Sequence, residues 1–240
     1  MRTSSCEGSR NSFVIFVARS SCSSWRVPCD ERGVALIITL LTMMLLSGLG
    51  LALTLTISTE MRISSAYASS AEVFYAADAA FERSVQDLSL IPDWSLVLGG
   101  VVRSSFVDGL PGTRQLPSGS ILDLRQETDR LNCGGATCGP WGPNNPMWQL
   151  FAHGPFVDLS PARAINSQIF IVVWVADAAT ENDGQPLVDG YTTSGPNPGK
   201  GLIQLLVHAY GPGRTRREVA GTLRREDARI RVLSWREVRQ

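Results

Sequence analysis

Residues 34–57 read VALIITLLTMMLLSGLGLALTLTI, a run of 24 residues without Asp, Glu, Lys or Arg. As an α-helix rising about 1.5 Å per residue, the run spans about 36 Å, enough to cross a hydrocarbon core of about 30 Å. It is longer than the apolar region of a secretory signal peptide, about 7–15 residues. Arg26 and Arg32 precede it, and Glu60 and Arg62 follow. This charge bias favours a cytoplasmic N-terminus and an exported C-terminal part.

The composition argues against two common functions. The 240 residues allow one domain of ordinary size, and 22 basic residues balance 22 acidic ones. Nucleic-acid binding is therefore not expected, because general nucleic-acid binders carry a basic excess. Neither of the two histidines, His153 and His208, lies in a Gly-x-Ser-x-Gly or His-Glu-x-x-His pattern, and no phosphate-binding or dinucleotide loop occurs. We therefore do not expect an enzyme.

The helix is predicted to continue beyond the apolar run. Proline is absent from Gly33 to Ile91. One face of a 3.6-residue helix collects Tyr67, Phe74, Ala77, Phe81, Val85 and Leu88. We expect one long helix within residues 34–91, transmembrane over 34–57, with its second half packed on a globular head. Gly48 and Gly50 each lower helix propensity by about 1 kcal/mol relative to Ala. They indicate either a place where the helix stretches on assembly or a close helix–helix contact.

Residues 92–240 are predicted to form a β-rich globular head. Gly and Pro become frequent after Pro92, and short runs typical of strands follow. The expected strands are Val101–Val107, Gln168–Ala176, Leu202–Tyr210, Arg216–Arg225 and Arg229–Trp235, with a helix at Leu122–Leu131 and a loop-rich region at Asn132–Pro161. The apolar run Ile169–Val175 is typical of a strand buried on both faces. The predicted fold class is α+β, with a mainly antiparallel sheet laid on the long helix.

The start of the apolar run carries a possible processing signal. Residues 30–38 read DERGVALII, so a charged stretch ends in one glycine directly before the helix. This junction resembles the processing site of type IV pilins and of type II secretion pseudopilins. The resemblance implies that a membrane peptidase removes a leader of residues 1–33, with cleavage between Gly33 and Val34. The alternative is an uncleaved signal anchor that happens to follow a glycine.

A longer stretch of sequence makes this resemblance more specific. It consists of RGVALIITLL at 32–41, EMRI at 60–63 and FYAADAAFE at 74–82. In this order and spacing it resembles the N-terminal domain of PilX-type minor pilins, and it is similar also to K-type pseudopilins. The resemblance implies a pilin-like fold and a minor subunit of a type IV pilus. The fifth mature position, usually Glu in major pilins, is Ile38 here, which by analogy with K-type pseudopilins implies a place at the filament tip.

The resemblance also implies partners and a location. The partners would be other minor and major pilins, the prepilin peptidase and the assembly platform of the inner membrane. The protein would cross that membrane once, with its head in the periplasm or outside the cell, and would assemble into a pilus or pseudopilus. Two alternatives stay open: a K-like pseudopilin of type II secretion, and a signal-anchored, ligand-binding domain that does not polymerise.

Removal of the leader would leave two cysteines, Cys133 and Cys138. An even number in an exported domain suggests a disulfide, and two glycines between them let the chain turn. So short a loop would contribute roughly 2 kcal/mol in the entropic model. The alternatives are a metal site completed by His153 and His208, or two free thiols.

Two charged segments of the head were further candidates. Asp177, Glu181, Asp183 and Asp189 surround a turn at Asn182–Gly184 and suggest a calcium site, with a solvated acidic loop as the alternative. Residues 214–239 carry nine Arg against four acidic residues. Such strands can bind phosphate groups, block aggregation at a sheet edge or simply face solvent. No cofactor is expected, and calcium at the acidic loop is the one candidate.

Overall fold

The computed structural model describes residues 31–134, 147–159, 167–179, 185–189, 201–226 and 229–238. Helix α1 runs from Glu31 to Ser89, 59 residues, in agreement with the long helix predicted from the sequence. The chain divides into two compact units, Met1–Thr56 and Ile57–Gln240. The boundary falls inside α1, close to the end of the apolar run. The first unit therefore holds the apolar run, and the second holds the rest of α1 with the head.

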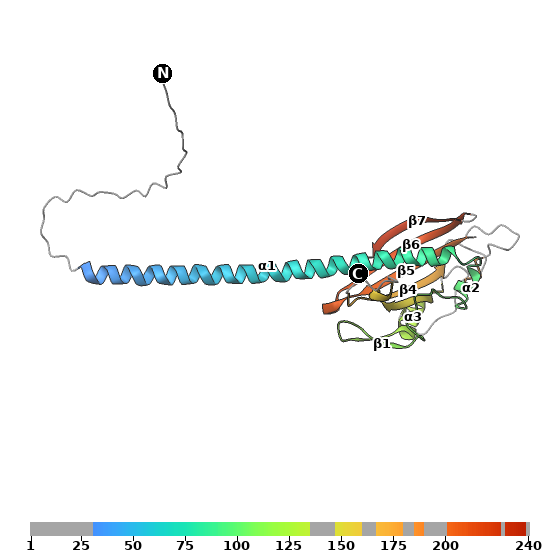
Figure 1. Cartoon of the computed structure of the whole chain (residues 1–240), viewed down its shortest axis with the longest axis horizontal. Helices are drawn as coiled ribbons and strands as arrows, with labels where there is room; N and C mark the ends of the chain where they lie inside the picture. The colour runs from blue at the N-terminus through green and yellow to red at the C-terminus, as the bar shows by residue number, and fades with distance from the viewer. Residues whose placement is uncertain are drawn as a thin grey trace, which may run out of the picture. The chain divides into compact units, whose positions relative to one another are not determined.

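The head is built on one antiparallel sheet with strand order β3-β4-β5-β6-β7 (Figure 1). Its strands are β3 (Gln149–Pro155), β4 (Phe170–Asp177), β5 (Leu202–Tyr210), β6 (Arg216–Glu226) and β7 (Arg229–Val238). A small ladder pairs β1 (Thr113–Gln115) with β2 (Ile121–Asp123). Helices α2 (Ser95–Leu98) and α3 (Leu124–Cys133) and the short 3-10 turns η1 (Phe156–Leu159) and η2 (Pro212–Arg214) complete it. The predicted α+β class is confirmed.

One face of the sheet packs on α1. The apolar core on this side joins Val73, Ala77 and Phe81 of the helix to alternate residues of the strands, such as Ile171 and Val207. Small helix residues and Gly221 let the elements approach closely, because a Cβ at Gly221 would come within 2.6 Å of the Phe81 ring. The packing explains why the periodic stripe of the sequence exists.

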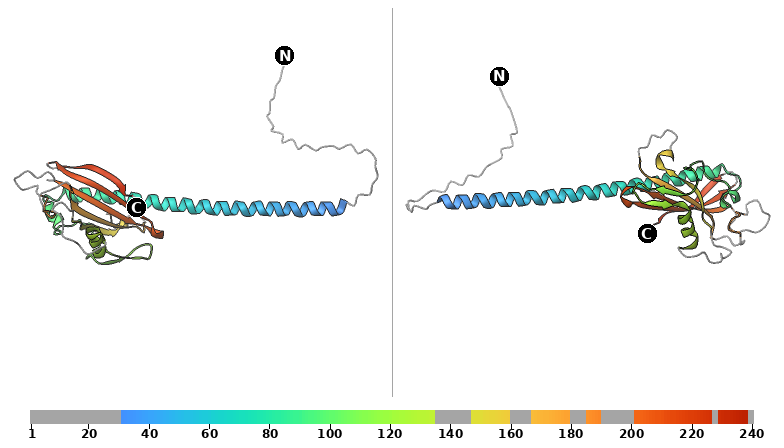
Figure 2. Two further views of the ribbon diagram at one scale, coloured as in Figure 1. Left: turned by 180° about the vertical axis from the view of Figure 1, so that it is seen from behind. Right: turned by 90° about the horizontal axis from the view of Figure 1, so that it is seen from below.

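The other face of the sheet packs on α3 and the β1–β2 ladder (Figure 2). Here the core consists of Leu124, Phe170, Val172, Trp174 and Leu206, with neighbours from the ladder. Strand β4 is buried along its whole length because both faces of the sheet are covered, as its continuous apolar run predicted. The Asp123 carboxylate caps α3 by accepting hydrogen bonds from the backbone N–H groups of Arg125 and Gln126.

Three predictions about local structure were wrong. Val101–Val107 is not a strand. It runs irregularly alongside β3, with one isolated bridge between Val107 and His153. Strand β3 was missed, because its sequence QLFAHGP contains His, Gly and Pro and lies in the region read as loop-rich. Tyr67, placed on the buried stripe, is 77% exposed, because the packed part of α1 begins near Val73.

Candidate functional site

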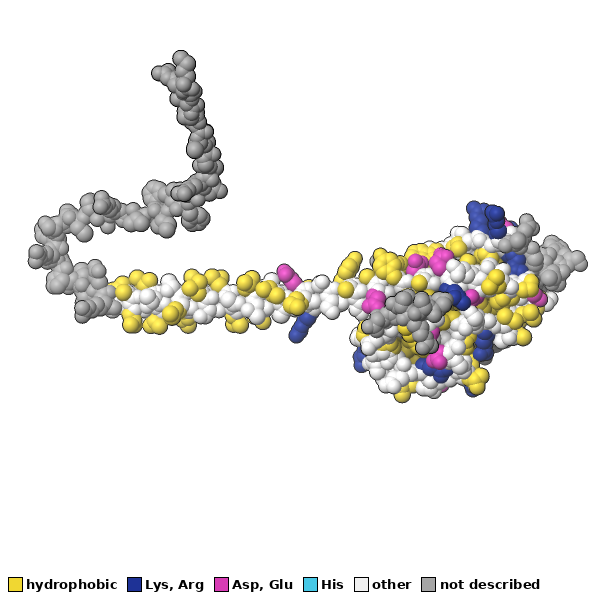
Figure 3. All heavy atoms as spheres, viewed as in Figure 1, with side chains coloured by type: hydrophobic (Ala, Val, Ile, Leu, Met, Phe, Trp, Pro, Cys, Tyr) yellow, Lys and Arg dark blue, Asp and Glu magenta, His cyan; other side chains and the backbone are white. Residues whose placement is uncertain are grey.

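The apolar run of α1 is the first candidate site, because no described residue of its own unit covers it. Every side chain from Gly33 to Ile57 is exposed, and Figure 3 shows hydrophobic side chains all along this part of the helix. By length and composition, α1 is the one helix among the described residues that could cross a membrane. Covering a Leu or Ile side chain fully stabilises it by about 1.5–3 kcal/mol. The segment therefore requires lipid or other helices around it.

The polar side chains inside the run are adapted to an apolar environment. All four threonines donate their hydroxyl groups to carbonyl oxygens three or four residues back in α1. These bonds are Thr39 to Leu36, Thr42 to Thr39, Thr54 to Gly50 and Thr56 to Ala52, at 2.8–3.0 Å. A hydroxyl transferred from water without such a partner costs several kcal/mol. These bonds remove that cost when lipid or a neighbouring helix covers the segment.

Two glycines in the run have no neighbour in the described chain. A Cβ added at Gly48 or Gly50 would meet nothing within 4 Å, and both glycines lie in regular helix. Packing within the chain therefore does not explain them. The two interpretations from the sequence, a stretching point and a close contact with another helix, both remain predictions.

The predicted cleavage junction lies at the start of α1. The helix begins at Glu31, so the bond between Gly33 and Val34 falls in its first turn, where backbone N–H groups lack an intrahelical acceptor. Val34 and Ile38 are both exposed, and a Cβ at Gly33 would meet no neighbour. This turn therefore lacks some of the backbone hydrogen bonds that the helix interior has. Cleavage and the role of Ile38 stay predictions.

The predicted disulfide and calcium sites fall partly outside the described residues. Cys133 ends α3, whereas Cys138 lies outside them. Glu181 and Asp183 of the acidic loop also lie outside. No group of three or more His, Cys, Asp or Glu side chains able to hold a metal occurs among the residues that the structure describes. Both sites stay predictions.

The two described carboxylates of the acidic loop are buried and hydrogen-bonded to the backbone. Asp177 ends β4, and its Oδ1 accepts a 2.8 Å hydrogen bond from the backbone N–H of Ala178. The Oδ1 of Asp189 accepts a 3.1 Å bond from the N–H of Gly201, and its own N–H donates to the Ser95 hydroxyl. The contacts of Asp189 join its segment to the residue before β5 and to the first residue of α2. These hydrogen bonds give both residues a structural role in the head.

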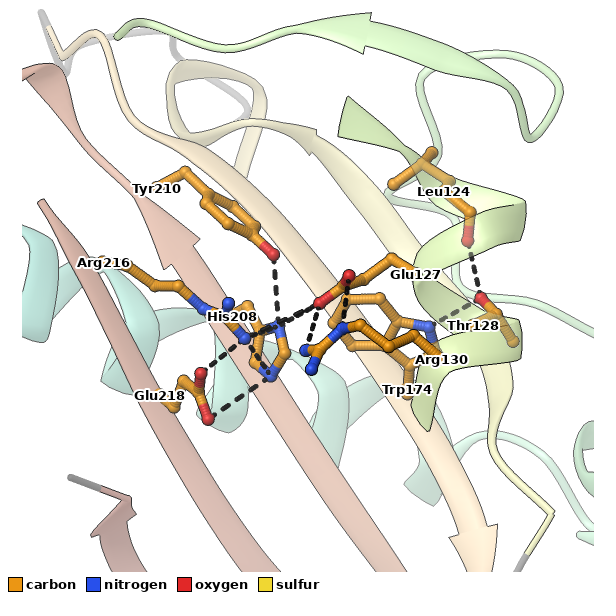
Figure 4. Close-up of polar contacts among 9 residues, drawn as sticks. All are labelled: Leu124, Glu127, Thr128, Arg130, Trp174, His208, Tyr210, Arg216 and Glu218. Atoms are coloured by element: carbon orange, nitrogen blue, oxygen red, sulfur yellow. Dashed lines mark hydrogen bonds and ion pairs between the residues drawn. The ribbon is translucent and has the colours of Figure 1, made fainter. Parts of the chain in front are cut away.

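A polar cluster between α3 and the sheet, buried at His208 and Glu218 and open to solvent at Arg130, was not predicted. It joins side chains of α3, β5 and β6, and consists of Glu127, Arg130, His208, Tyr210, Arg216 and Glu218 (Figure 4). The cross-strand register brings the strand members together, because His208 pairs with Glu218 and Tyr210 with Arg216. The alternation of polar residues in His208-x-Tyr210 and Arg216-x-Glu218 was visible in the sequence. Their pairing with α3 was not.

The charges of the cluster are balanced by direct contacts. Arg130 donates two hydrogen bonds to the Glu127 carboxylate, at 2.7 and 2.9 Å. The Nη2 of Arg216 lies 2.5 Å from Glu218 Oε1 and 3.7 Å from Glu127 Oε1, so its guanidinium bridges α3 and β6. Two carboxylates thus face two guanidinium groups.

His208 lies at the centre of the cluster and is fully buried. Its Nε2 is 3.6 Å from Glu218, its Nδ1 is 3.2 Å from the Tyr210 hydroxyl, and Trp174 packs against its ring. Burial, helped by Arg216 and then Arg130, holds the pKa of His208 well below its usual value, so the ring is neutral at pH 7. Burial also raises the pKa of Tyr210.

The pKa values of the two carboxylates, Glu127 and Glu218, shift in opposite directions. The hydrogen bonds from Arg130 lower the pKa of Glu127, whereas burial raises the pKa of Glu218 despite Arg216 beside it. On the neighbouring strand, Trp174 Nε1 donates to the Thr128 hydroxyl, which donates to the Leu124 carbonyl oxygen. The arrangement fastens α3 to the sheet. His208 is fully buried and both carboxylates are ion-paired. We therefore interpret the cluster as a structural contact between α3 and the sheet.

Comparison with known proteins identifies the N-terminal part. The protein is an α+β chain whose first helix exposes an uncharged apolar segment and whose head packs on the remainder of that helix. Residues 32–82 match the family model described as PilX N-terminal. This segment is therefore similar to the N-terminal domain of PilX-type minor pilins. No curated protein and no solved structure matches the chain.

The match covers the part of the chain that the sequence singled out. It begins one residue before Gly33 and ends at Glu82, so it lies entirely within α1. The resemblance to PilX-type pilins is confirmed there. The resemblance to K-type pseudopilins stays a prediction.

Proposed function

We propose that this protein is a minor subunit of a type IV filament whose α1 inserts its apolar segment among the helices of neighbouring subunits. The observation that carries the proposal is the segment itself, which matches the PilX N-terminal family, exposes apolar side chains on all sides and satisfies its threonine hydroxyls internally. Before assembly the same segment anchors the protein in the inner membrane. The head then lies in the periplasm or outside the cell.

The proposed partners follow from this role. Major and other minor pilins supply the surrounding helices, the prepilin peptidase removes residues 1–33, and the assembly platform of the inner membrane extracts the mature subunit. The absence of any acidic side chain from Val34 to Ile57 supports a tip position. A carboxylate at the centre of a membrane helix costs about 2.5–3.5 kcal/mol on insertion scales. A subunit with Ile38 avoids that cost but offers no carboxylate to the terminal amine of an adjoining subunit.

A photocrosslinking residue placed at Leu46 tests the proposal most selectively. Leu46 lies in the middle of the exposed apolar segment. Crosslinks to the apolar segments of other pilin subunits in sheared filaments support the proposal. Crosslinks to lipid alone, with no filament-associated product, support the non-polymerising, signal-anchored alternative. The same residue at Leu110, an exposed apolar position of the head, is the matched control and should give no helix crosslinks.

The copy number in sheared filaments tests the tip position. A tip subunit is present in very few copies per filament, and Ile38→Glu should spread it along the shaft. A copy number comparable to that of the major pilin contradicts the tip position. A K-like pseudopilin is distinguished by the filament system in which the subunit is recovered, because it co-purifies with the secretion pseudopilus rather than with the pilus.

A further inference from the structure

The two edge strands of the sheet differ in whether another segment hydrogen-bonds along their outer side. At one margin, β3 is accompanied by residues 104–108: Ser104 N–H donates to Phe151 O, His153 N–H to Phe106 O and Asp108 N–H to His153 O, at 2.8–3.1 Å. At the other margin, β7 has β6 as its only strand neighbour among the residues that the structure describes (Figures 1 and 2). Residues 231–236 of β7 are all exposed. The outer edge of β7 therefore offers a row of main-chain groups to an added strand.

On the α1 side of the sheet, β7 carries the apolar side chains of Val232 and Trp235, followed by Glu237, which forms a 2.8 Å ion pair with Arg217. Val232 pairs with the buried Leu223, and Trp235 pairs with Gly221 and packs edge-on against Phe74, with 5.9 Å between ring centroids. Nevertheless, Val232 and Trp235 keep exposed fractions of 40% and 42%. An added strand would cover them further, which contributes about 25 cal/mol per Å² of apolar area.

Two exposed arginines, Arg231 and Arg236, lie on the other face of β7. Arg231 lies directly opposite Arg224 of β6, and Arg236 lies opposite Ala220. Like charges at directly opposed positions repel each other. Figure 3 shows basic side chains gathered at the hairpin end of β6 and β7. Among the residues that the structure describes, Arg231 forms one ion pair, a 3.8 Å contact with the exposed Glu226, which neutralises one of these charges at most.

The apolar and basic side chains of β7 indicate which kind of strand could pair with its outer edge. A second copy docking β7 against β7 would bring one arginine row against another, and repulsion disfavours that. We propose that β7 receives an extended segment of a partner protein, added as a sixth strand, with acidic side chains on its Arg231 side and apolar or aromatic side chains on its Trp235 side. Main-chain hydrogen bonds supply affinity in such strand addition, and the alternating side chains supply specificity. This inference does not depend on the proposed filament role.

The test uses the full chain in detergent and a fluorescent peptide of ten residues, the length of β7, that alternates Glu with Val or Phe. Two control peptides carry the same residues in blocks, or Lys in place of Glu. The alternating acidic peptide should bind at least about tenfold more tightly than either control, a difference of about 1.4 kcal/mol. Equal binding of the block peptide overturns the proposal, because strand addition requires alternation. Displacement by polyphosphate at equal charge concentration also overturns it, because it identifies a generic anion surface.

Matched variants locate the peptide on the edge. Arg231→Glu should weaken binding at least about tenfold, whereas Arg224→Glu, the same charge change one strand further in, should weaken it less than about threefold. Trp235→Ser should weaken binding, and Leu110→Ser, at another exposed apolar position, should leave it unchanged. Unfolding midpoints of all four variants separate binding from folding. Equal losses for Arg231→Glu and Arg224→Glu in folded proteins overturn the proposal.

Discussion

Between Val34 and Ile57, α1 exposes apolar side chains on every side, whereas between Val73 and Leu88 the same helix buries one stripe against the sheet. Both segments are regular helix, so backbone conformation does not distinguish them. The difference lies in the distribution of apolar residues around the helix axis. A stripe can be satisfied by one sheet within the chain, but an all-round apolar surface needs partners on all sides. One helix thus combines a segment that packs on the head with a segment that lipid or other helices must cover.

The largest expected effect on the head comes from Phe81→Ala. Phe81 is fully buried against Gly221 and the sheet. Its truncation should lower the free energy of unfolding by about 3–5 kcal/mol. Leu46→Ala, in the exposed run, should change it by less than about 0.5 kcal/mol. Urea unfolding of the full chain in detergent, followed by tryptophan fluorescence, measures both. Similar losses for the two variants would mean that the halves of α1 are not functionally distinct.

The reverse experiment places a charge in each half. Leu46→Arg should weaken membrane insertion by about 2.5–3.5 kcal/mol, the cost of Arg at the centre of a spanning helix. Tyr67→Arg, exposed but outside the apolar run, should leave insertion intact. The carbonate-resistant membrane fraction of cells reports the outcome. Undiminished insertion of Leu46→Arg would show that the run is not the anchor.

The ion pairs on the α3 side of the sheet offer a second contrast, because the Glu218 carboxylate is buried whereas Arg231 and Glu226 are exposed. Arg216→Met should lower the free energy of unfolding by about 1.5–3 kcal/mol, since Glu218 loses its charged partner in a buried setting. Arg231→Met removes an exposed 3.8 Å ion pair and should cost about 0–1 kcal/mol. Chemical denaturation distinguishes them. If Arg216→Met lowers the free energy of unfolding no more than Arg231→Met does, the cluster around His208 does not stabilise the packing of α3 on the sheet.

The sequence predicted the elements whose signals are local. Helix α1 lacks proline and has a clear periodicity, and β5 was predicted with its observed bounds, Leu202–Tyr210, because its apolar run ends at Gly211-Pro212. Strand β3 gave no such signal, since its partners β4 and residues 104–108, not its own composition, make it a strand. The buried cluster escaped prediction for a related reason. Its formation depends on where α3 lies on the sheet, which no local spacing encodes.

The smallest effects concern pH. Burial lowers the pKa of both His208 and His153 in the folded chain, with neighbouring arginines adding to the shift. Near pH 6.5 the histidines of the unfolded chain bind protons, whereas those of the folded chain stay neutral. Their contribution to the free energy of unfolding is therefore present above that pH and is lost as the pH falls below it. Each histidine contributes a slope of up to about 1.4 kcal/mol per pH unit. His208→Gln should flatten the dependence between pH 6.5 and 5 more than His153→Gln does. An unchanged slope in both variants would contradict this account.

The N-terminus of the protein recovered from sheared filaments tests the central claim most directly. Mass spectrometry should find a mature chain that begins at Val34, and Gly33→Arg should abolish both the processed form and its presence in filaments, because a cleft that accepts Gly has no room for a long charged side chain. The α1 segment would then be a cleaved and assembled pilin helix. Recovery of intact residues 1–240 from membranes of a host that has the peptidase, with none in filaments, would contradict the assignment and leave a signal-anchored head.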